Sequence, residues 1–216
     1  MVSGDSPATE LFPQFETRLY QMVAAEAEGL NDAQLDFESD RWEWSKWSIR
    51  RNLSHVASGD FRWIWVRWGP QLFPQGLPNG PELDALCDSP HDRRLDENKY
   101  WGVEVILEKV RQGLALCWSV LSTETVGSLR TKVLETPSNT LWAEHREIFP
   151  DGVREYPGDS SKVYMTLEAT FLHRYYEYLA HLYNIQRLKK AQGLEPVVEV
   201  PFEGYYALPG WDRSEP

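Results

Sequence analysis

Residues 162–192, which contain no proline or glycine, read KVYMTLEATFLHRYYEYLAHLYNIQRLKKAQ. The length of this stretch predicts one long helix, and Gly193 directly after it is a typical helix C-cap. The stretch is covered mainly with Leu, Phe, Tyr and Ile, apart from one line of polar residues. This segment therefore predicts the longest helix of a helical protein, with a distinct polar stripe along it.

The polar stripe contains the residue types of a metal site. At about 100° per residue its members fall within an arc of about 80°; they are Thr166, Thr170, His173, Glu177, His181 and Asn184. The central three, His173, Glu177 and His181, recur every four residues, a spacing that lets side chains one turn apart bind one ion. Imidazole and carboxylate suit Zn, Ni or Fe(II), and three ligands leave positions open for water or substrate. The alternative is a solvent-facing or structural polar row.

Three more helices are predicted upstream, over about residues 13–30, 48–68 and 98–121. Ser48 is a suitable N-cap for the second, and Gly69-Pro70 ends it because proline removes a backbone donor. Residues 69–97 form a long crossover. Residues 122–162 are predicted to be irregular, with short extended pieces near Leu141 and Ile148, and the tail 193–216 to lie across the body. We expect an all-α four-helix bundle in a single domain, residues 1–216.

A third metal ligand would come from the second helix, where His55 is the candidate, since His91 and His145 are predicted in loops. The apolar positions of that helix cluster on another side, while His55 shares a face with Ser48, Arg51, Ser58 and Arg62. A solvated histidine is one interpretation. The other is that this face borders a pocket, with its arginines available for an anionic substrate.

Composition excludes several functions. The chain has 33 acidic and 22 basic residues, a balance that disfavours binding to nucleic acid or to anionic membranes. Its two cysteines, Cys87 and Cys117, form no CxxC pair, and neither is assigned a nucleophilic role. No apolar run is long enough to span a membrane and the first residues lack signal-peptide features, so we expect a cytoplasmic protein.

Aromatic residues are unusually abundant, with ten tryptophans. Phe61, Trp65 and Trp68 share one face of the second helix and Trp63 lies on another; core packing is favoured over a dimer interface or pocket wall. The aromatic helix end and the tail nevertheless predict a homodimer. The segment 142–147 is predicted to be an exposed loop with a solvated His145, the alternative being a lid that carries His145 to the site.

The segment Trp47–Val56, WSIRRNLSHV, resembles the second-helix signature of the DinB/YfiT-like superfamily. In the last helix, the positions that match the family pattern in register are His173, Glu177, His181, Ile185 and Gly193. Two positions depart from it: Glu177 stands where histidine is usual, and Asn184 where glutamine is usual. The resemblance covers about residues 10–122 and 162–193. It implies a DinB-like four-helix bundle, often dimeric, with a metal site that maps to His55, Glu177 and His181.

The resemblance implies a metal-dependent enzyme with a bound divalent Zn, Ni or Fe ion. The expected activity is a transferase that acts on a small-molecule substrate with a low-molecular-weight thiol, or else a metal-assisted hydrolase. His173, one turn before Glu177, is expected to support the ligands or carry a proton. The alternative is a non-catalytic DinB-like binding protein with a structural polar stripe. Serine-hydrolase and phosphate-loop motifs are absent from the sequence.

Overall fold

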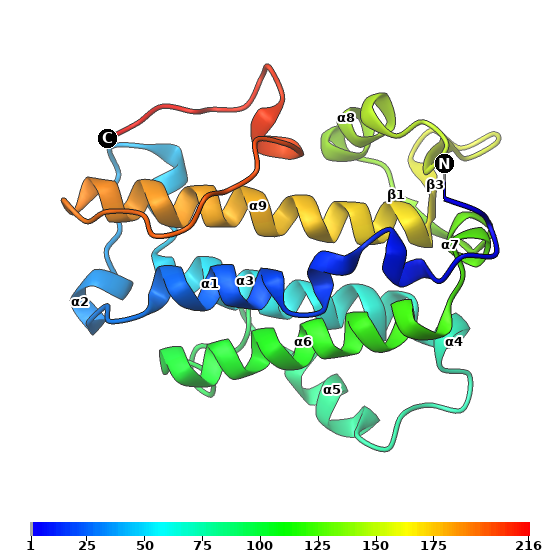
Figure 1. The fold of residues 1–216 in the computed structure, drawn as a ribbon, viewed down its shortest axis with the longest axis horizontal. Helices are drawn as coiled ribbons and strands as arrows, with labels where there is room; N and C mark the ends of the chain where they lie inside the picture. Colours follow the sequence, from blue (N-terminus) through cyan, green and yellow to red (C-terminus); the bar gives the residue numbers. More distant parts are fainter. Residues whose placement is uncertain (1) are drawn as a thin grey trace. The chain divides into compact units, whose positions relative to one another are not determined.

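The structure, a computed structural model, describes residues 2–216 and is mostly helical, with one small three-stranded sheet (Figure 1). The sheet is a departure from the predicted all-α class. Among the described residues, no helix combines the length and the apolar content needed to cross a membrane.

The chain divides into two compact units, each built from two separate stretches of sequence. Unit 1 consists of Met1–Pro13 and Trp118–Arg174, and unit 2 of Gln14–Cys117 and Tyr175–Pro216. Two long helices contribute residues to both units, α6 (Val103–Thr123) and α9 (Leu167–Ala191). The expected single domain over residues 1–216 stays a prediction.

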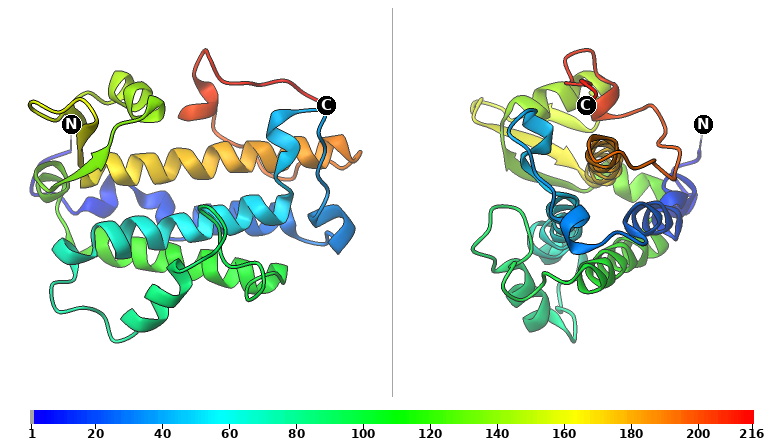
Figure 2. Two further views of the ribbon diagram at one scale, coloured as in Figure 1. Left: turned by 180° about the vertical axis from the view of Figure 1, so that it is seen from behind. Right: turned by 90° about the vertical axis from the view of Figure 1, so that its left-hand side faces the viewer.

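Unit 2 contains most of the helices. Besides its parts of α6 and α9, its helical elements are α1 (Arg18–Ala27), α2 (Asp32–Leu35), η3 (Glu43–Lys46), α3 (Ile49–Phe61), η4 (Arg62–Arg67), α4 (Gly69–Leu72), α5 (Gly80–Cys87) and η5 (Tyr205–Ala207). Within this unit, α1, α3, the first part of α6 and the second part of α9 lie side by side, as the end-on view in Figure 2 shows. These four segments correspond to the four helices predicted from the sequence.

Close contacts hold these helices together. The buried Tyr178 hydroxyl of α9 donates to Asp60 Oδ2 of α3, at 2.7 Å. On α6, a Cβ added at Gly113 would lie 2.9 Å from the Cβ of Asp60, so only glycine lets α6 approach α3 this closely. The apolar side chains between the helices are buried, including Leu19, Val23, Leu53, Val56, Val110, Leu114, Leu182 and Ile185. Cys117 is buried among them, as the sequence predicted.

Helix α3 follows the sequence prediction closely. The Ser48 hydroxyl accepts from the backbone N–H of Arg51, which confirms Ser48 as the N-cap. The helix widens into a π-helical segment, η4, around which Phe61, Trp63 and Trp68 are buried and pack in the core, while Trp65 is only partly buried. Core packing of this aromatic end is therefore confirmed, whereas the homodimer stays a prediction.

Unit 1 carries the sheet, in the segment that was predicted to be irregular. Its elements are η1 (Ala8–Glu10), α7 (Val126–Thr131), β1 (Val133–Pro137), α8 (Thr140–Ile148), β2 (Val153–Glu155) and β3 (Lys162–Thr166). The strands are antiparallel in the order β1-β3-β2, with Val133 opposite Thr166 and Val153 opposite Met165. The extended pieces expected near Leu141 and Ile148 are wrong, because Asn139 caps α8 by accepting from the Trp142 N–H.

The last helix begins five residues later than predicted. Residues 162–166 pair with both neighbouring strands as β3, and Thr166 Oγ1 then accepts from the Ala169 N–H at 3.1 Å. This hydrogen bond satisfies one of the free donors at the start of α9. At the other end, Gly193 adopts a φ of 73°, which confirms it as the C-cap.

A buried ion pair fixes the C-terminal tail to the helices of unit 2. Glu26 of α1 is fully buried, and its Oε2 lies 2.6 Å from Lys189 Nζ of α9. Its Oε1 accepts from Gln186 and from the backbone N–H groups of Val197 and Val198. Because this one carboxylate joins α1, α9 and the tail, the three pieces pack in a single arrangement.

We expect Lys189→Met to destabilise the protein by about 3–5 kcal/mol, because it leaves the Glu26 carboxylate buried without its cation. Chemical denaturation monitored by circular dichroism measures this change. The matched control is Lys190→Met, whose ion pair with Glu215 is half exposed and whose loss should cost about 0–1 kcal/mol. Equal effects of the two substitutions would contradict the role given to Glu26.

The same ion pair predicts a pH dependence. Burial alone would raise the pKa of Glu26, but Lys189, Gln186 and two backbone N–H groups together hold it below the ordinary value of 4.5. The stability from this carboxylate is therefore present above pH 4.5 and lost as the pH falls through the lower, folded-state pKa. We expect the stability difference between the wild-type protein and Glu26→Gln to be largest near pH 7 and to shrink below pH 4.5 in denaturation series.

Candidate metal centre

Three polar side chains converge in unit 2, and they are the three predicted metal ligands. His55 comes from α3, while Glu177 and His181 lie one turn apart on α9. Their ligand atoms all lie within 4.8 Å of one another. His55 Nε2 is 3.0 Å and His181 Nε2 is 3.6 Å from the same carboxylate atom, Glu177 Oε2. His55 is buried, and the other two are partly buried.

His55 is anchored from its other ring nitrogen. Nδ1 lies 2.9 Å from the backbone carbonyl oxygen of Arg93, in the crossover that follows α5. A carbonyl oxygen can only accept, so Nδ1 carries the proton and donates. In the neutral ring, Nε2 then presents its lone pair toward Glu177.

Asn52 anchors His181 in the same way. The Asn52 amide nitrogen donates to the carbonyl oxygens of Trp47 and Ser48, at 3.0 and 2.9 Å, which identifies the amide oxygen as the atom that faces His181. His181 Nδ1 lies 2.6 Å from this oxygen and therefore donates to it. The second imidazole is thus also held with its Nε2 lone pair toward Glu177.

The result is a set of three acceptors that face one another. An ionised carboxylate and two imidazole nitrogens in this tautomer repel each other unless a proton or a cation lies between them. Two ligands of a tetrahedral ion, each about 2.0–2.1 Å from it, are about 3.3 Å apart, close to the observed 3.0 and 3.6 Å. The residues present therefore fit a divalent cation in both chemistry and spacing.

An open cavity of about 370 Å³ adjoins the three side chains, and the Trp47 ring forms part of its wall. The ring centre of Trp47 lies 5.3 Å from that of His55 and 6.3 Å from that of His181. The cavity is lined by Glu43, Trp44, Lys46, Trp47, Asn52, His55, Arg93, Glu177, His181 and Asn184. His55 therefore borders a pocket, as the second interpretation of its helix face proposed, and is not a solvated surface residue.

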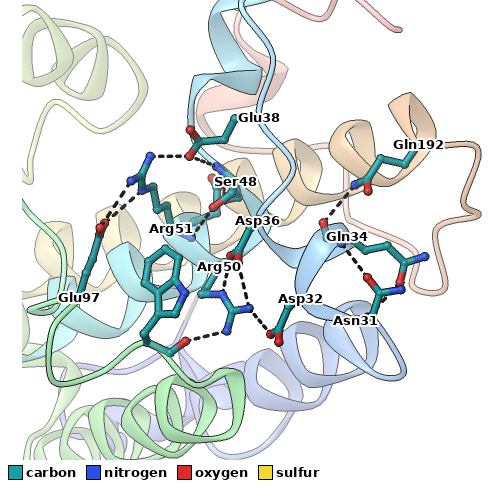
Figure 3. Close-up of polar contacts among 12 residues, drawn as sticks. Asn31, Asp32, Gln34, Asp36, Glu38, Ser48, Arg50, Arg51, Glu97 and Gln192 are labelled. Carbon is teal, nitrogen blue, oxygen red and sulfur yellow. Dashed lines mark hydrogen bonds and ion pairs between the residues drawn. The ribbon is translucent and has the colours of Figure 1, made fainter.

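The arginines expected at this pocket have other roles. Arg51 forms ion pairs with Glu38 and Glu97 at 2.6 and 3.1 Å, shown in Figure 3. Arg62 donates to the Ser58 hydroxyl and to the Cys87 carbonyl oxygen. The arginine that lines the cavity is instead Arg93, which sequence reasoning missed.

Arg93 also has an unusual backbone. Its φ of 56° lies in the left-handed region, and it is the one non-glycine residue among residues 2–216 recorded there. A side chain in this region costs about 1–2 kcal/mol, a strain that concentrates at functional sites. In this conformation the Arg93 carbonyl oxygen accepts the hydrogen bond from His55 Nδ1. No sequence signal marks this position, whereas Asn52 and Trp47 at least lie within the segment that resembles the family signature.

His173 belongs to unit 1 and precedes Glu177 by four residues in the sequence of α9. Its ring is buried and meets the rings of Trp142 and His145 of α8 edge-on, with centres 4.8 and 6.4 Å apart. Its expected role in catalysis stays a prediction. The exposed loop with a solvated His145 is wrong: residues 140–148 form α8, both Trp142 and His145 are buried, and burial lowers the pKa of His145 to about 4.

Cys87 is not activated as a nucleophile. Burial, with a smaller contribution from Asp84, raises the pKa of its thiol to about 11 although Arg62 opposes the shift. The thiol is therefore protonated at neutral pH and weakly reactive.

Comparison of the chain with protein-family models, curated proteins and solved structures found no match.

The hydrogen bonds to Arg93 and Asn52 predict protonated Nδ1 atoms on both histidines at neutral pH. We expect directly bonded ¹H–¹⁵N imidazole signals from Nδ1 of His55 and of His181. In Asn52→Leu the His181 signal should be lost to rapid exchange with water, while His55 keeps its signal and serves as the internal control. An unprotonated Nδ1 on either ring of the wild-type protein would contradict the assignment.

Proposed function

We propose that this protein is a metal-dependent enzyme of the DinB-like superfamily, with a four-helix bundle formed by α1, α3, α6 and α9. The proposed ligands of its divalent cation, Zn, Ni or Fe(II), are His55, Glu177 and His181. The observation that carries this proposal is the convergence of two oriented Nε2 lone pairs and one carboxylate on a single point. Two imidazoles and a carboxylate form a set that leaves room for water or substrate on such ions.

A divalent cation bound there would supply Lewis acidity, lowering the pKa of a coordinated water or thiol so that it reacts near neutral pH. The chain's own residues hold the centre in shape. Asn52 and the Arg93 carbonyl keep both imidazoles in the tautomer that presents Nε2, and such outer partners raise metal affinity. Trp47 shields one side of both histidines from water.

The reaction that we propose is a transfer that uses a low-molecular-weight thiol as nucleophile, with metal-assisted hydrolysis as the second candidate. The cavity beside the centre is large enough for a small-molecule substrate. A role for His173 as a proton carrier also remains part of the proposal.

One observation favours a non-catalytic alternative for part of the polar stripe. The Thr170 hydroxyl donates to the Thr166 carbonyl oxygen, and His173 packs against Trp142. The first half of the stripe is therefore buried, and Thr166 and Thr170 have structural roles. A DinB-like binding protein without catalysis would require the same of Glu177 and His181, and metal content separates the two cases.

We expect the purified, untagged protein to bind about one Zn, Ni or Fe ion per chain, measured by elemental analysis after incubation with each metal and desalting. Retention of none of these metals would contradict the proposal and favour the non-catalytic alternative.

Substitutions at Glu177 test the ligand set. Glu177→Gln keeps the size of the side chain but removes its charge, so metal affinity should fall sharply, whereas Glu177→His should retain metal through three imidazoles. His173→Ala should weaken binding by no more than about 10–100-fold, whereas His181→Ala should abolish it. If His173→Ala strips the metal and Glu177→Gln keeps it, His173 is a ligand in place of Glu177.

A further inference from the structure

Several hydrogen-bond donors line the cavity beside the candidate metal centre, and the charged ones pair with exposed carboxylates. The Arg93 side chain is 63% exposed, and its recorded ion pair is with its own neighbour Asp92, which is 83% exposed. Exposed pairs of this kind contribute little stability and exchange readily with other anions. The Arg93 guanidinium is therefore available to a ligand in the cavity.

Two further donors line the same cavity. Lys46 is half exposed and pairs with Glu43, which is 79% exposed. Asn184 accepts from Arg187 through its amide oxygen, so its NH₂ group is the end left to face the cavity. Arg187 itself is buried and stacks on Trp44. Its hydrogen bond to Asn184 therefore fixes the position of that side chain.

With a divalent cation bound, the charge of this cavity would be opposite to that of the chain, because the two cationic and two anionic side chains of its lining cancel. The protein carries a formal net charge of −11. Apart from the histidines and Glu177, the charged side chains that line the cavity are Lys46, Arg93 and Glu43. Because Glu177 offsets only half of a divalent cation, the loaded cavity is positive and attracts anions.

Trp47 adds a flat apolar surface to this positive site. The guanidinium groups of Arg93 and Arg94 lie 5.9 and 5.2 Å from the Trp47 ring centre, and Trp47 is partly buried. A ligand with a carboxylate or phosphate near Arg93 and a flat or apolar body against Trp47 would use both features.

We propose that this cavity binds a small organic oxyanion, a carboxylate or a phosphate ester with a flat or apolar body. In this arrangement Arg93 is the principal anion-binding residue, Lys46 and Asn184 are additional donors, and Trp47 is the stacking surface. The inference rests on the proposed function, since it places this ligand beside the metal and makes it the candidate substrate class.

Isothermal titration of the zinc-loaded protein with benzoate, phenyl phosphate and benzamide tests the proposal. Benzoate and benzamide have the same shape and differ in charge, so we expect benzoate to bind at least tenfold more tightly. Whichever of benzoate and phenyl phosphate binds more tightly shows whether the site prefers a carboxylate or a phosphate ester. Equal affinities for benzoate and benzamide would overturn the proposal.

Arg93→Gln should weaken binding of both anions at least tenfold and leave benzamide unchanged. It keeps the backbone carbonyl that holds His55, so metal content should stay at the wild-type level. The matched control is Arg41→Gln, because Arg41 also stacks on a tryptophan, Trp42, but does not line the cavity. Equal anion affinities of Arg93→Gln, Arg41→Gln and the wild-type protein would overturn the proposal.

The two proposals fail in different ways. If the protein retains no metal but benzoate binding to the metal-free protein still depends on Arg93, the oxyanion site stands and the metal-dependent function falls. If metal is retained at one ion per chain and benzoate binding is absent or independent of Arg93, the oxyanion site falls and the metal centre stands.

Discussion

Hydrogen bonds from α9 to α3 hold together the two helices on which the candidate site depends. Tyr178 donates to Asp60 in the buried interior, and one turn further on His181 donates to Asn52. Buried polar groups that lose such partners cost roughly 1–3 kcal/mol each, so these contacts define one register between the helices. A shift of either helix by one residue would turn His55 away from Glu177. The same contacts that specify the packing therefore also assemble the site.

The site combines a rigid inner part with a more accessible rim. The histidines are fixed by a side-chain amide and a backbone carbonyl, both anchored in unit 2. The charged groups at the rim, Lys46 and Arg93, are exposed and form ion pairs with neighbours close in sequence. Rigid ligands suit a centre that must hold an ion in a set geometry, whereas exposed donors are free to engage a ligand from solution. The strained backbone of Arg93 connects the two parts, because one residue supplies both an anchor and a rim cation.

Ion pairs formed by buried side chains elsewhere in unit 2 account for the position of α2 and of the tail. Arg50 of α3 is buried and pairs with two exposed carboxylates, Asp32 and Asp36, which ties α2 to the start of α3 (Figure 3). Glu26 and Lys189 tie the tail to α1 and α9. Removing the partner of a buried charge is costly, because that charge is left without compensation in a poor solvent for ions. These interactions fix α2 and the C-terminal tail against the long helices of unit 2.

Features set by local interactions could be predicted from the sequence: the helix over most of residues 162–192, the Ser48 cap, the Gly193 cap and the four-residue spacing of Glu177 and His181. Capping, backbone freedom and helical periodicity act over a few residues and can be read from them. The sheet in unit 1, the burial of His145, and the partners Asn52 and Arg93 depended on contacts between distant residues. Residues 162–166 are strand because β1 and β2 pair with them, and a helix-compatible sequence cannot reveal those partners. The sequence by itself determined which side chains could bind a metal; the tertiary structure decided that His55 faces them, because only packing of α3 on α9 orients that ring.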